Sequence, residues 1–406
     1  MYEYHTLNNG LRIIFRHSDS AVAYSGVYIN IGSRDEQPTE YGMAHFIEHS
    51  IFKGTEHRRA YHILNRIDGV GGELNAFTTK EETCIYASSM NEHLERCLEL
   101  FADVLFHSVF PQKELDKEKD VIIEEINSYQ DSPSELIYDE FEEFIYEGHP
   151  LAHNILGSKR NVRHFTPEQV RDFMRRNYTT DRMVVTVVAN IKFDHLIRLC
   201  ERFFGSYERL KSDAQRNTAP QPCHFDKTIN RHTHQTHLLL GCPAPNIYNE
   251  DKVAFTLLNN IIGGPAMNSR LNVAIRERYG FCYTIESQYV PFSDAGLFYI
   301  YAGIDSDALE RVKHLIHQEL QHFADHAMTP RQLQQAQRQL IGQMAIVNDL
   351  ALNEMQSIGK ACLNYNKADT IEEMTADILS ITASEIQTTA ARYLDAQSFS
   401  ILTYRG

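Results

Sequence analysis

The alternation of hydrophobic and polar residues along the chain predicts a mixture of strands and amphipathic helices. In the first half, the pattern predicts strands near 11–16 and 22–31, a hairpin near 73–89, and helices near 42–54, 91–107 and 112–130. In the second half, it predicts strands near 235–242, 283–290 and 295–304, and helices near 250–262, 306–326, 330–360 and 383–394. Because strands and helices are grouped rather than strictly alternating, the pattern favours an α+β fold, with helices packed on one face of an antiparallel-rich sheet in each half.

One pair of elements occurs twice in the sequence. The segment 165–178 has the pattern of an amphipathic helix and leads into the β-branched run 183–188, and 381–394 leads in the same way into 399–404. In each copy a threonine precedes Gln or Glu by three positions, which is the capping box that begins many helices: Thr166 with Gln169, and Thr382 with Glu385. The copies are 216 residues apart in a chain of 406 residues, so the sequence predicts two duplicated halves.

A polar segment separates the two predicted halves. Residues 211–222 include two prolines and show no hydrophobic period, which is typical of a linker. We therefore expect a first half at 1–210, the linker at 211–222, and a homologous second half at 223–406. Each half is long enough to bury a core of its own.

The composition narrows the range of partners and compartments. Acidic residues outnumber basic ones, 54 to 39, and the net charge of −15 disfavours nucleic acid or an anionic membrane surface as the main partner. No stretch of about 18 apolar residues occurs, so we expect no membrane span. The seven cysteines form no Cys-x-x-Cys pair, and we expect them to be reduced and mostly buried. Since the N-terminus also shows no signal peptide, we expect a cytoplasmic protein.

Three His-x-x-x-His pairs are candidates for metal binding. With 20 histidines in the chain such pairs also arise by chance, so the context of each pair decides. The pair His149 and His153 encloses Pro150, which disfavours one continuous helix and predicts a solvated loop. The pair His322 and His326 flanks the apolar stripe of a helix, which predicts a solvated helix face. Neither pair is a strong candidate.

The third pair lies in His45-Phe-Ile-Glu-His49 and differs in kind. The predicted helix is apolar nearly all round, yet His45, Glu48 and His49 fall within roughly one 100° arc of it. Burying three ionisable groups without partners would cost several kcal/mol, so they need partners. Two imidazoles at this spacing can bind one metal ion, and the glutamate beside them can take a proton from a water molecule there. The alternative is a histidine pair satisfied inside the core.

A third metal ligand is expected on the helix near 112–130. On a helical wheel the apolar arc is defined by four residues: Leu115, Val121, Ile122 and Ile126. Glu118 and Glu125 fall inside that arc and are predicted to be buried, whereas Glu124 falls outside it. One carboxylate can bind the metal while the other orients a ligand or a water molecule. The alternative is that both acids only border a helix interface.

These residues together resemble a known family. His-x-x-Glu-His, with a glutamate 76 residues after His49, is similar to the inverzincin signature of the pitrilysin/insulin-degrading-enzyme superfamily of zinc peptidases. In its length, the chain resembles the branch of this superfamily that contains the mitochondrial processing peptidase and its bacterial relatives. Three further stretches extend the resemblance: 42–55, 71–79 and 275–283.

The resemblance implies a role for each matching residue. It implies zinc ligands at His45, His49 and Glu125, a general base at Glu48, and an orienting carboxylate at Glu118. It also implies that a substrate strand lies along residues 74–78. The substrate-binding residues would be Asn75, Ala76 and Phe77. In the second half, Arg276 and Tyr283 would hold the substrate close to the metal.

The implied activity is that of a zinc-dependent endopeptidase acting on peptides or unfolded polypeptide segments in an enclosed chamber. The second half lacks His-x-x-Glu-His, so we expect one zinc ion per chain. Since relatives of this length enclose the chamber with two chains, we expect a homodimer. Two alternatives are a non-catalytic peptide-binding or scaffold subunit, and a zinc site that serves stability alone. The acidic segment 135–147 is expected to be a solvated helix face, or else to attract basic substrates.

Overall fold

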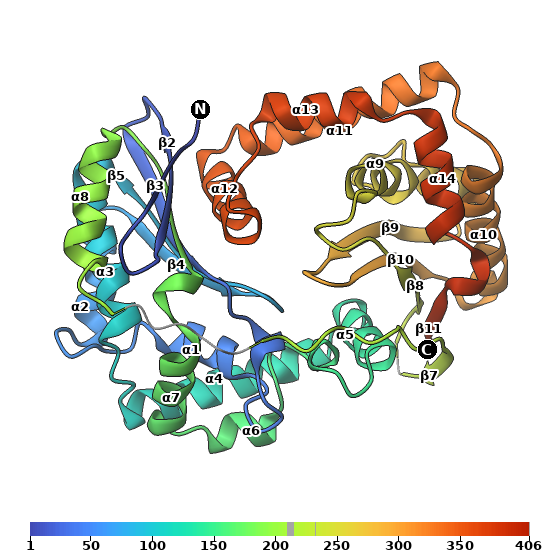
Figure 1. The fold of residues 1–406 in the computed structure, drawn as a ribbon. Helices are drawn as coiled ribbons and strands as arrows, with labels where there is room; N and C mark the ends of the chain where they lie inside the picture. The colour runs from blue at the N-terminus through green and yellow to red at the C-terminus, as the bar shows by residue number, and fades with distance from the viewer. Residues whose placement is uncertain (209–214, 232, 406) are drawn as a thin grey trace. The chain divides into compact units, whose positions relative to one another are not determined.

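The computed structural model describes residues 1–208, 215–231 and 233–405, and these residues form two compact units (Figure 1). Unit 1 comprises Met1–Asn127, His153–Asn217 and Ile346–Thr370. Unit 2 comprises Ser128–Ala152, Thr218–Ala345 and Ile371–Gly406. The units change at residue 217, inside the expected linker, although linker residues 211–214 lie outside the described residues. Each unit also includes a segment from the other half of the sequence, which pattern reasoning did not predict.

Unit 1 is built on a six-stranded sheet with the order β1-β2-β6-β3-β5-β4. Its strands are β1 (Glu3–Thr6), β2 (Arg12–His17), β3 (Val22–Ile29), β4 (Glu73–Thr78), β5 (Thr83–Met90) and β6 (Met183–Ala189). The pair β2 and β6 is parallel, and all other neighbours are antiparallel. The strand β4 pairs with β5 alone among the described strands, so it forms an edge of the sheet.

Unit 2 repeats this topology. Its strands are β7 (Asp226–Asn230), β8 (Thr236–Pro243), β9 (Cys282–Pro291), β10 (Gly296–Ile304) and β11 (Ser400–Arg405). Their order, β7-β11-β8-β10-β9, matches β2-β6-β3-β5-β4 position by position, including one parallel pair at the same place. The repeated helix and strand of the sequence are α7 (Pro167–Asn177) with β6 and α14 (Ala383–Tyr393) with β11, and each helix has the expected capping box. The predicted duplication is confirmed at the level of topology.

The sheet of unit 1 has helices on both faces. One face packs on the main core, to which these helices contribute: α1 (Met43–Ser50), α2 (Ala60–Asp68), α3 (Leu94–Phe106), α4 (Gln112–Gln130), α6 (Lys159–His164), α7 and α8 (Phe193–Phe204). The other face is covered by α12 (Ala351–Tyr365), opposite α3 and α8 (Figure 1). The apolar run Val-Val-Thr-Val-Val within β6 is buried throughout, and such a strand needs cover on both faces.

The segment near 330–360, expected to be one helix, forms two. They are α11 (Pro330–Asn348), which belongs mainly to unit 2, and α12, which belongs to unit 1. Leu350 between them has an extended backbone, and the two helices pack into different cores. Helical periodicity alone does not reveal such a break, because both parts remain amphipathic.

The sheet of unit 2 also has helices on both faces (Figure 1). Its remaining helices are α5 (Pro133–Ile145), α9 (Lys252–Gly263), α10 (Leu309–Asp325) and α13 (Ile371–Ser380). The helix α5 packs through Ile137, Phe141 and Ile145 on the face opposite to α9 and α10. The expectation that segment 135–147 is a solvated face was wrong in part, because Glu142 is buried and accepts a hydrogen bond of 2.9 Å from the Tyr299 hydroxyl.

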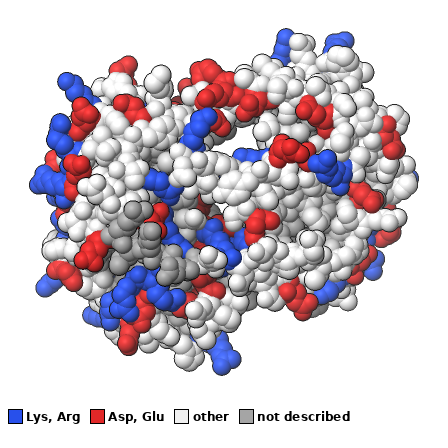
Figure 2. Space-filling view, in the orientation of Figure 1, with Lys and Arg blue, Asp and Glu red and all other residues white. Residues whose placement is uncertain are grey.

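The surface mixes charges of both signs. Acidic and basic side chains are interspersed over the face drawn in Figure 2. No helix among the described residues is long and apolar enough to cross a membrane. Of the cysteines, only Cys223 is exposed and the others are buried, as expected for small apolar side chains.

Candidate metal centre

The helix α1 that carries the His-x-x-Glu-His motif depends for its beginning on a carboxylate that precedes it by a few residues. Its N-cap is Gly42, which has no side chain to cap the helix and adopts a left-handed backbone with φ of 99°. The side chain of Glu36 supplies the missing acceptors, at 2.8 Å from the amide nitrogen of Gly42 and 2.7 Å from that of Ala44. These contacts satisfy amide groups that would otherwise lack partners at the first turn.

Glu36 is fully buried, and the same oxygen that accepts from Gly42 also contacts His153. Its Oε2 lies 2.9 Å from His153 Nε2, and the ring of Tyr41 stacks on His153 with a centroid distance of 3.7 Å. Burial raises the pKa of Glu36 well above its ordinary value, and the two amide hydrogen bonds oppose that shift. Sequence reasoning did not identify Glu36. The available signal was a glycine at the helix start, because such a helix needs an acceptor from elsewhere.

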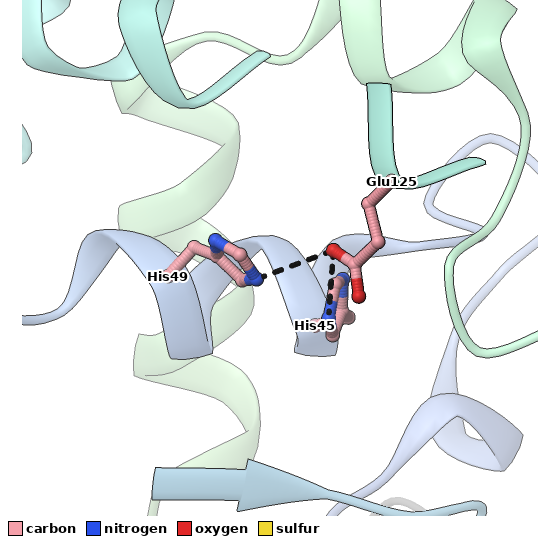
Figure 3. A group of neighbouring side chains, drawn as sticks. All are labelled: His45, His49 and Glu125. Carbon is pink, nitrogen blue, oxygen red and sulfur yellow. Dashed lines mark ion pairs between the residues drawn. The ribbon is translucent and has the colours of Figure 1, made fainter. Parts of the chain in front are cut away.

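His45, His49 and Glu125 converge on one point (Figure 3). The two imidazoles lie on α1, one turn apart, and the carboxylate of Glu125 reaches toward them from α4 (Figure 3). Glu125 Oε2 lies 3.7 Å from His45 Nε2 and 3.5 Å from His49 Nε2. In a tetrahedral zinc site with bonds of about 2.0–2.1 Å, ligand atoms are about 3.3 Å apart. The observed spacing therefore fits a single ion between the three side chains.

The protonation of His45 suits metal binding. Burial and the nearby His49 lower the pKa of His45 to about 3, so its imidazole is neutral at pH 7. Its buried Nδ1 has no hydrogen-bond partner among the described residues, and its Nε2 faces Glu125. A neutral imidazole with a free lone pair is the form that a zinc ion requires. The donor set of two imidazoles and one carboxylate is typical of catalytic zinc sites.

Glu118 contacts His49 at Nδ1, the ring nitrogen that does not face Glu125. Its Oε2 lies 3.4 Å from His49 Nδ1, and its Oε1 lies 2.7 Å from Lys53 Nζ. Burial raises the pKa of Glu118, but His49 and Lys53 outweigh that effect and leave the pKa below its ordinary value. Glu118 is therefore a carboxylate that can fix the ring orientation of His49. The contact with Glu118 in turn raises the pKa of His49, although burial opposes the shift.

The helical wheel of α4 predicted burial correctly for Glu118 and exposure correctly for Glu124. It was wrong for Val121, which is 50% exposed, and only partly right for Glu125, whose side chain is 43% exposed. The reason is geometric. The buried arc is centred on Leu115 and Ile122, so Val121 lies outside it and Glu125 lies at its edge, facing His45 and His49.

Glu48 lies on α1 beside the three converging side chains and is largely buried. Burial raises the pKa of its carboxyl group, while Thr78 of β4 and His49 act in the opposite direction. A carboxylate whose pKa is raised toward neutrality is a more effective base than an ordinary glutamate.

The predicted substrate-binding residues Asn75, Ala76 and Phe77 lie on the edge strand β4, next to α1. Ala76 packs against the main core, whereas Asn75 and Phe77 point to the opposite face. The side chain of Asn75 is exposed, and the ring of Phe77 contacts Tyr28 and Tyr86. None of the described strands pairs with the outer edge of β4, which lies next to α1.

Arg276 and Tyr283 lie together in unit 2. Arg276 belongs to a π-helical turn, Asn272–Glu277, and Tyr283 lies near the start of β9. The guanidinium carbon of Arg276 is 5.9 Å from the ring centroid of Tyr283, and Tyr283 is 85% exposed. π-Helical turns are rare and occur frequently at functional sites.

The other histidine pairs behave differently from one another. His322 and His326 are exposed and their rings stack at 4.8 Å, as predicted for a solvated helix face. The prediction of a solvated loop for His149 and His153 was wrong, because both are largely buried. Pro150 begins a short helical turn that buries its neighbour Leu151, and His153 packs under Tyr41.

Comparisons with known proteins agree with the fold. The family model described as Insulinase (Peptidase family M16) matches residues 12–159, and the model described as Peptidase M16 inactive domain matches residues 164–340. The uncharacterized zinc protease YmxG of Bacillus subtilis is 34% identical, over 95% of this chain and 94% of the relative. An uncharacterized zinc protease of Streptomyces coelicolor is 33% identical, over 95% of this chain and 85% of the relative.

Solved structures show the same fold at lower identity. A protease from Helicobacter pylori superposes with a TM-score of 0.91 at 21% identity, covering 100% of both chains. A peptidase M16 inactive domain from Pseudomonas fluorescens gives a TM-score of 0.91 at 20% identity, covering 100% of this chain and 98% of that one. Together with relatives above 30% identity along nearly the whole length, these matches show that the chain belongs to peptidase family M16, in its short bacterial form.

Proposed function

We propose that this protein is a zinc-dependent endopeptidase that cleaves peptides or unfolded polypeptide segments. The observation that carries the proposal is the convergence of His45, His49 and Glu125 on one point, with Glu48 beside them on α1. Relatives named zinc protease support the coarser assignment to a peptidase. One catalytic zinc ion per chain fits the motif, because α9, at the position in unit 2 that corresponds to α1, lacks His-x-x-Glu-His.

In the proposed reaction, Glu48 accepts a proton from the attacking water molecule and passes it to the leaving amine. A zinc ion bound by His45, His49 and Glu125 would supply Lewis acidity at the scissile carbonyl and lower the pKa of water there. Glu118 holds the ring of His49 in the orientation that leaves Nε2 free for the metal. Glu36 holds the first turn of α1 in place, so that both imidazoles keep their direction.

The substrate would bind as an added strand on β4. An edge strand offers unpaired amide and carbonyl groups, and a peptide that pairs with them needs no fixed sequence. Asn75, Ala76 and Phe77 would define the register, with Asn75 and Phe77 on one face and Ala76 on the other. Because peptides and unfolded chains present extended segments readily, the proposal favours them as substrates.

Arg276 and Tyr283 would bind the substrate carbonyl oxygen or backbone near the cut. A guanidinium and a phenol are both hydrogen-bond donors, as stabilisation of a developing negative charge requires. The short length of the chain supports a homodimer that encloses the reaction chamber, in which these two residues and the metal centre can come from different chains.

The experiment that tests the proposed function is the substitution Glu48→Gln. The variant should retain zinc, because Glu48 is not a ligand, and should lose cleavage of a mixed peptide library by at least about 100-fold. The matched control is Glu124→Gln, because Glu124 lies exposed on α4 and should be dispensable. Chelation of the wild-type protein should abolish cleavage, and zinc should restore it.

Two results would contradict the proposal. Full cleavage activity of Glu48→Gln would show that Glu48 is not the general base. Absence of any metal-dependent cleavage by the wild-type protein, with zinc bound, would favour the non-catalytic peptide-binding or scaffold subunit instead.

A further inference from the structure

A second group of metal-binding side chains lies in unit 1, outside the centre described above. One nitrogen each of His57 and His107 and one carboxylate oxygen of Glu56 lie within 4.8 Å of one another. The rings of His57 and His107 meet edge to face at a centroid distance of 4.6 Å, and Glu56 Oε2 lies 3.4 Å from His107 Nδ1. This last distance is close to the separation of about 3.3 Å expected for two ligands of one zinc ion.

Each imidazole of this group has its other nitrogen already engaged. His57 Nδ1 lies 2.6 Å from Asp103 Oδ1, and His107 Nε2 lies 2.7 Å from the hydroxyl of Tyr207. These contacts leave His57 Nε2 and His107 Nδ1 for an ion. Zinc-binding histidines characteristically donate their second ring N–H to a carboxylate or another polar group, which fixes the ring.

The carboxylate behind His57 is itself held firmly. Asp103 is buried at the end of α3 and accepts hydrogen bonds from the Thr55 hydroxyl at 2.9 Å and from Arg58 Nη1 at 2.6 Å. The hydrogen bonds around Asp103 therefore position His57 in the absence of any ion.

The backbone around the group is also fixed. The amide of Glu56 donates to the carbonyl of His107 at 2.9 Å, and Thr55 forms an isolated β-bridge with Ser108. The group thus joins two segments, the turn that follows α1 and the C-terminal end of α3. Glu56 and His107 also line a cavity of about 390 Å³, which gives an ion access from solvent.

We propose that Glu56, His57 and His107 form a second site for a divalent transition-metal ion, with zinc as the natural candidate. The ion would be bound by two imidazoles and one carboxylate, and Asp103 and Tyr207 would orient the two rings. Its remaining coordination positions face solvent, because the side chains of His57 and Glu56 are 55% and 65% exposed. This site clamps the turn after α1 to α3 and takes no part in the proposed cleavage.

The test is a count of ions on the full-length chain. Metal-free protein titrated with Zn²⁺ against a competing chromophoric chelator should bind two ions per chain. The variant His57→Gln/His107→Gln should bind one, and so should His45→Gln/His49→Gln. Tyr207→Phe keeps the ring that stacks on Phe106, and should bind the second ion about tenfold more weakly.

The matched control is His195→Gln, which removes an exposed histidine of α8 and should leave the count at two. If the double variant of His57 and His107 fails to fold, Glu56→Gln, which changes an exposed side chain, tests the same site through a weaker second binding event. A single ion on the wild-type chain, or a second ion that persists unchanged in these variants, would overturn the proposal. Because the readout is metal content, it does not depend on whether the protein cleaves peptides.

Discussion

At the scale of single residues, the surroundings of each acidic side chain separate the roles that we propose. Glu36 is fully buried and caps α1, Glu118 is buried against His49 and Lys53, and Glu125 remains partly open to solvent. A buried carboxylate with fixed partners is suited to orient another group. A partly exposed carboxylate can receive an ion from solvent and coordinate it.

Glu118→Gln tests the orienting role. The amide keeps the shape of the side chain but loses the negative charge that faces His49 and Lys53. We expect zinc affinity to fall by about 10–100-fold, because the partner of a ligand contributes that much to binding. The measurement is zinc competition with a chelator of known affinity. Glu124→Gln, six residues along the same helix, serves as the control, and an equal loss there would argue against a specific role for Glu118.

At the scale of elements, α12 fits closely against the sheet of unit 1. A methyl group on Gly359 would meet the ring of Tyr28 at 2.7 Å and Cγ2 of Thr186 at 2.9 Å. The hydroxyl of Thr186, buried in the middle of β6, donates to the carbonyl of Met355 at 2.9 Å. A glycine on α12 and a threonine on β6 thus form a matched contact between a helix and a sheet.

Gly359→Ala should destabilise the protein by about 1–3 kcal/mol, because the added methyl group forces α12 away from the sheet. Gly342→Ala on α11 is the matched control, since a methyl group there meets nothing within 4 Å. That substitution should stabilise the protein by about 0.5–1 kcal/mol, as expected for alanine in a helix interior. Denaturant unfolding measures both effects, and similar changes of the same sign would contradict the proposed packing.

The two capping boxes offer a test of pH dependence. Hydrogen bonds from the backbone amide and the side chain of Thr382 lower the pKa of Glu385, whereas Gln169 in the other box is neutral. A carboxyl group whose pKa is lower in the folded state than in the unfolded state stabilises the folded state at pH values above its ordinary pKa. This stabilisation is lost as the pH falls through the pKa of the folded state.

Glu385→Ala should therefore cost about 0.3–1 kcal/mol at pH 7, and the cost should shrink as the pH falls below the ordinary value of 4.5. Gln169→Ala should cost a similar amount without this pH dependence, because the amide does not titrate. Unfolding curves at pH 7 and at lower pH measure both variants. Equal pH dependence for the two would refute the assigned role of the Glu385 charge.

At the scale of the whole molecule, the two units share one topology but only unit 1 carries the metal motif. Unit 2 carries Arg276 and Tyr283, to which we assign the binding of substrate near the cut. After a duplication, one copy can keep the chemistry while the other specialises in binding. In the proposed homodimer, the metal centre of one chain can work with Arg276 of the other.

A mixture of two inactive variants tests this arrangement. Glu48→Gln keeps Arg276, and Arg276→Ala keeps the metal centre with its base, so a mixed dimer contains one complete site only if the two parts come from different chains. After random exchange of chains, we expect roughly a quarter of the wild-type cleavage activity. Sedimentation checks that the mixed species is a dimer. Activity that stays at the level of the separate variants would mean that each site is built within one chain.

The sequence by itself determined the features that depend on local spacing. The positions of His45, Glu48 and His49 on one face follow from the period of a helix, and the capping boxes follow from residues three positions apart. The strand β10 was also predictable, because its sequence is a continuous apolar run. The residues that give such a signal lie within a few positions of one another. The signal is therefore present in the sequence and does not depend on tertiary contacts.

Only the tertiary structure decided the features that depend on contacts between distant segments. The contact of Glu36 with His153, the covering of one sheet by α12 and of the other by α5, and the partial exposure of Glu125 could not be read from periodicity. Each depends on which surface a side chain or helix meets, and several surfaces would satisfy the same hydrophobic pattern. Long-range packing selects one of them, because only that arrangement buries the apolar groups while giving each buried charge a partner.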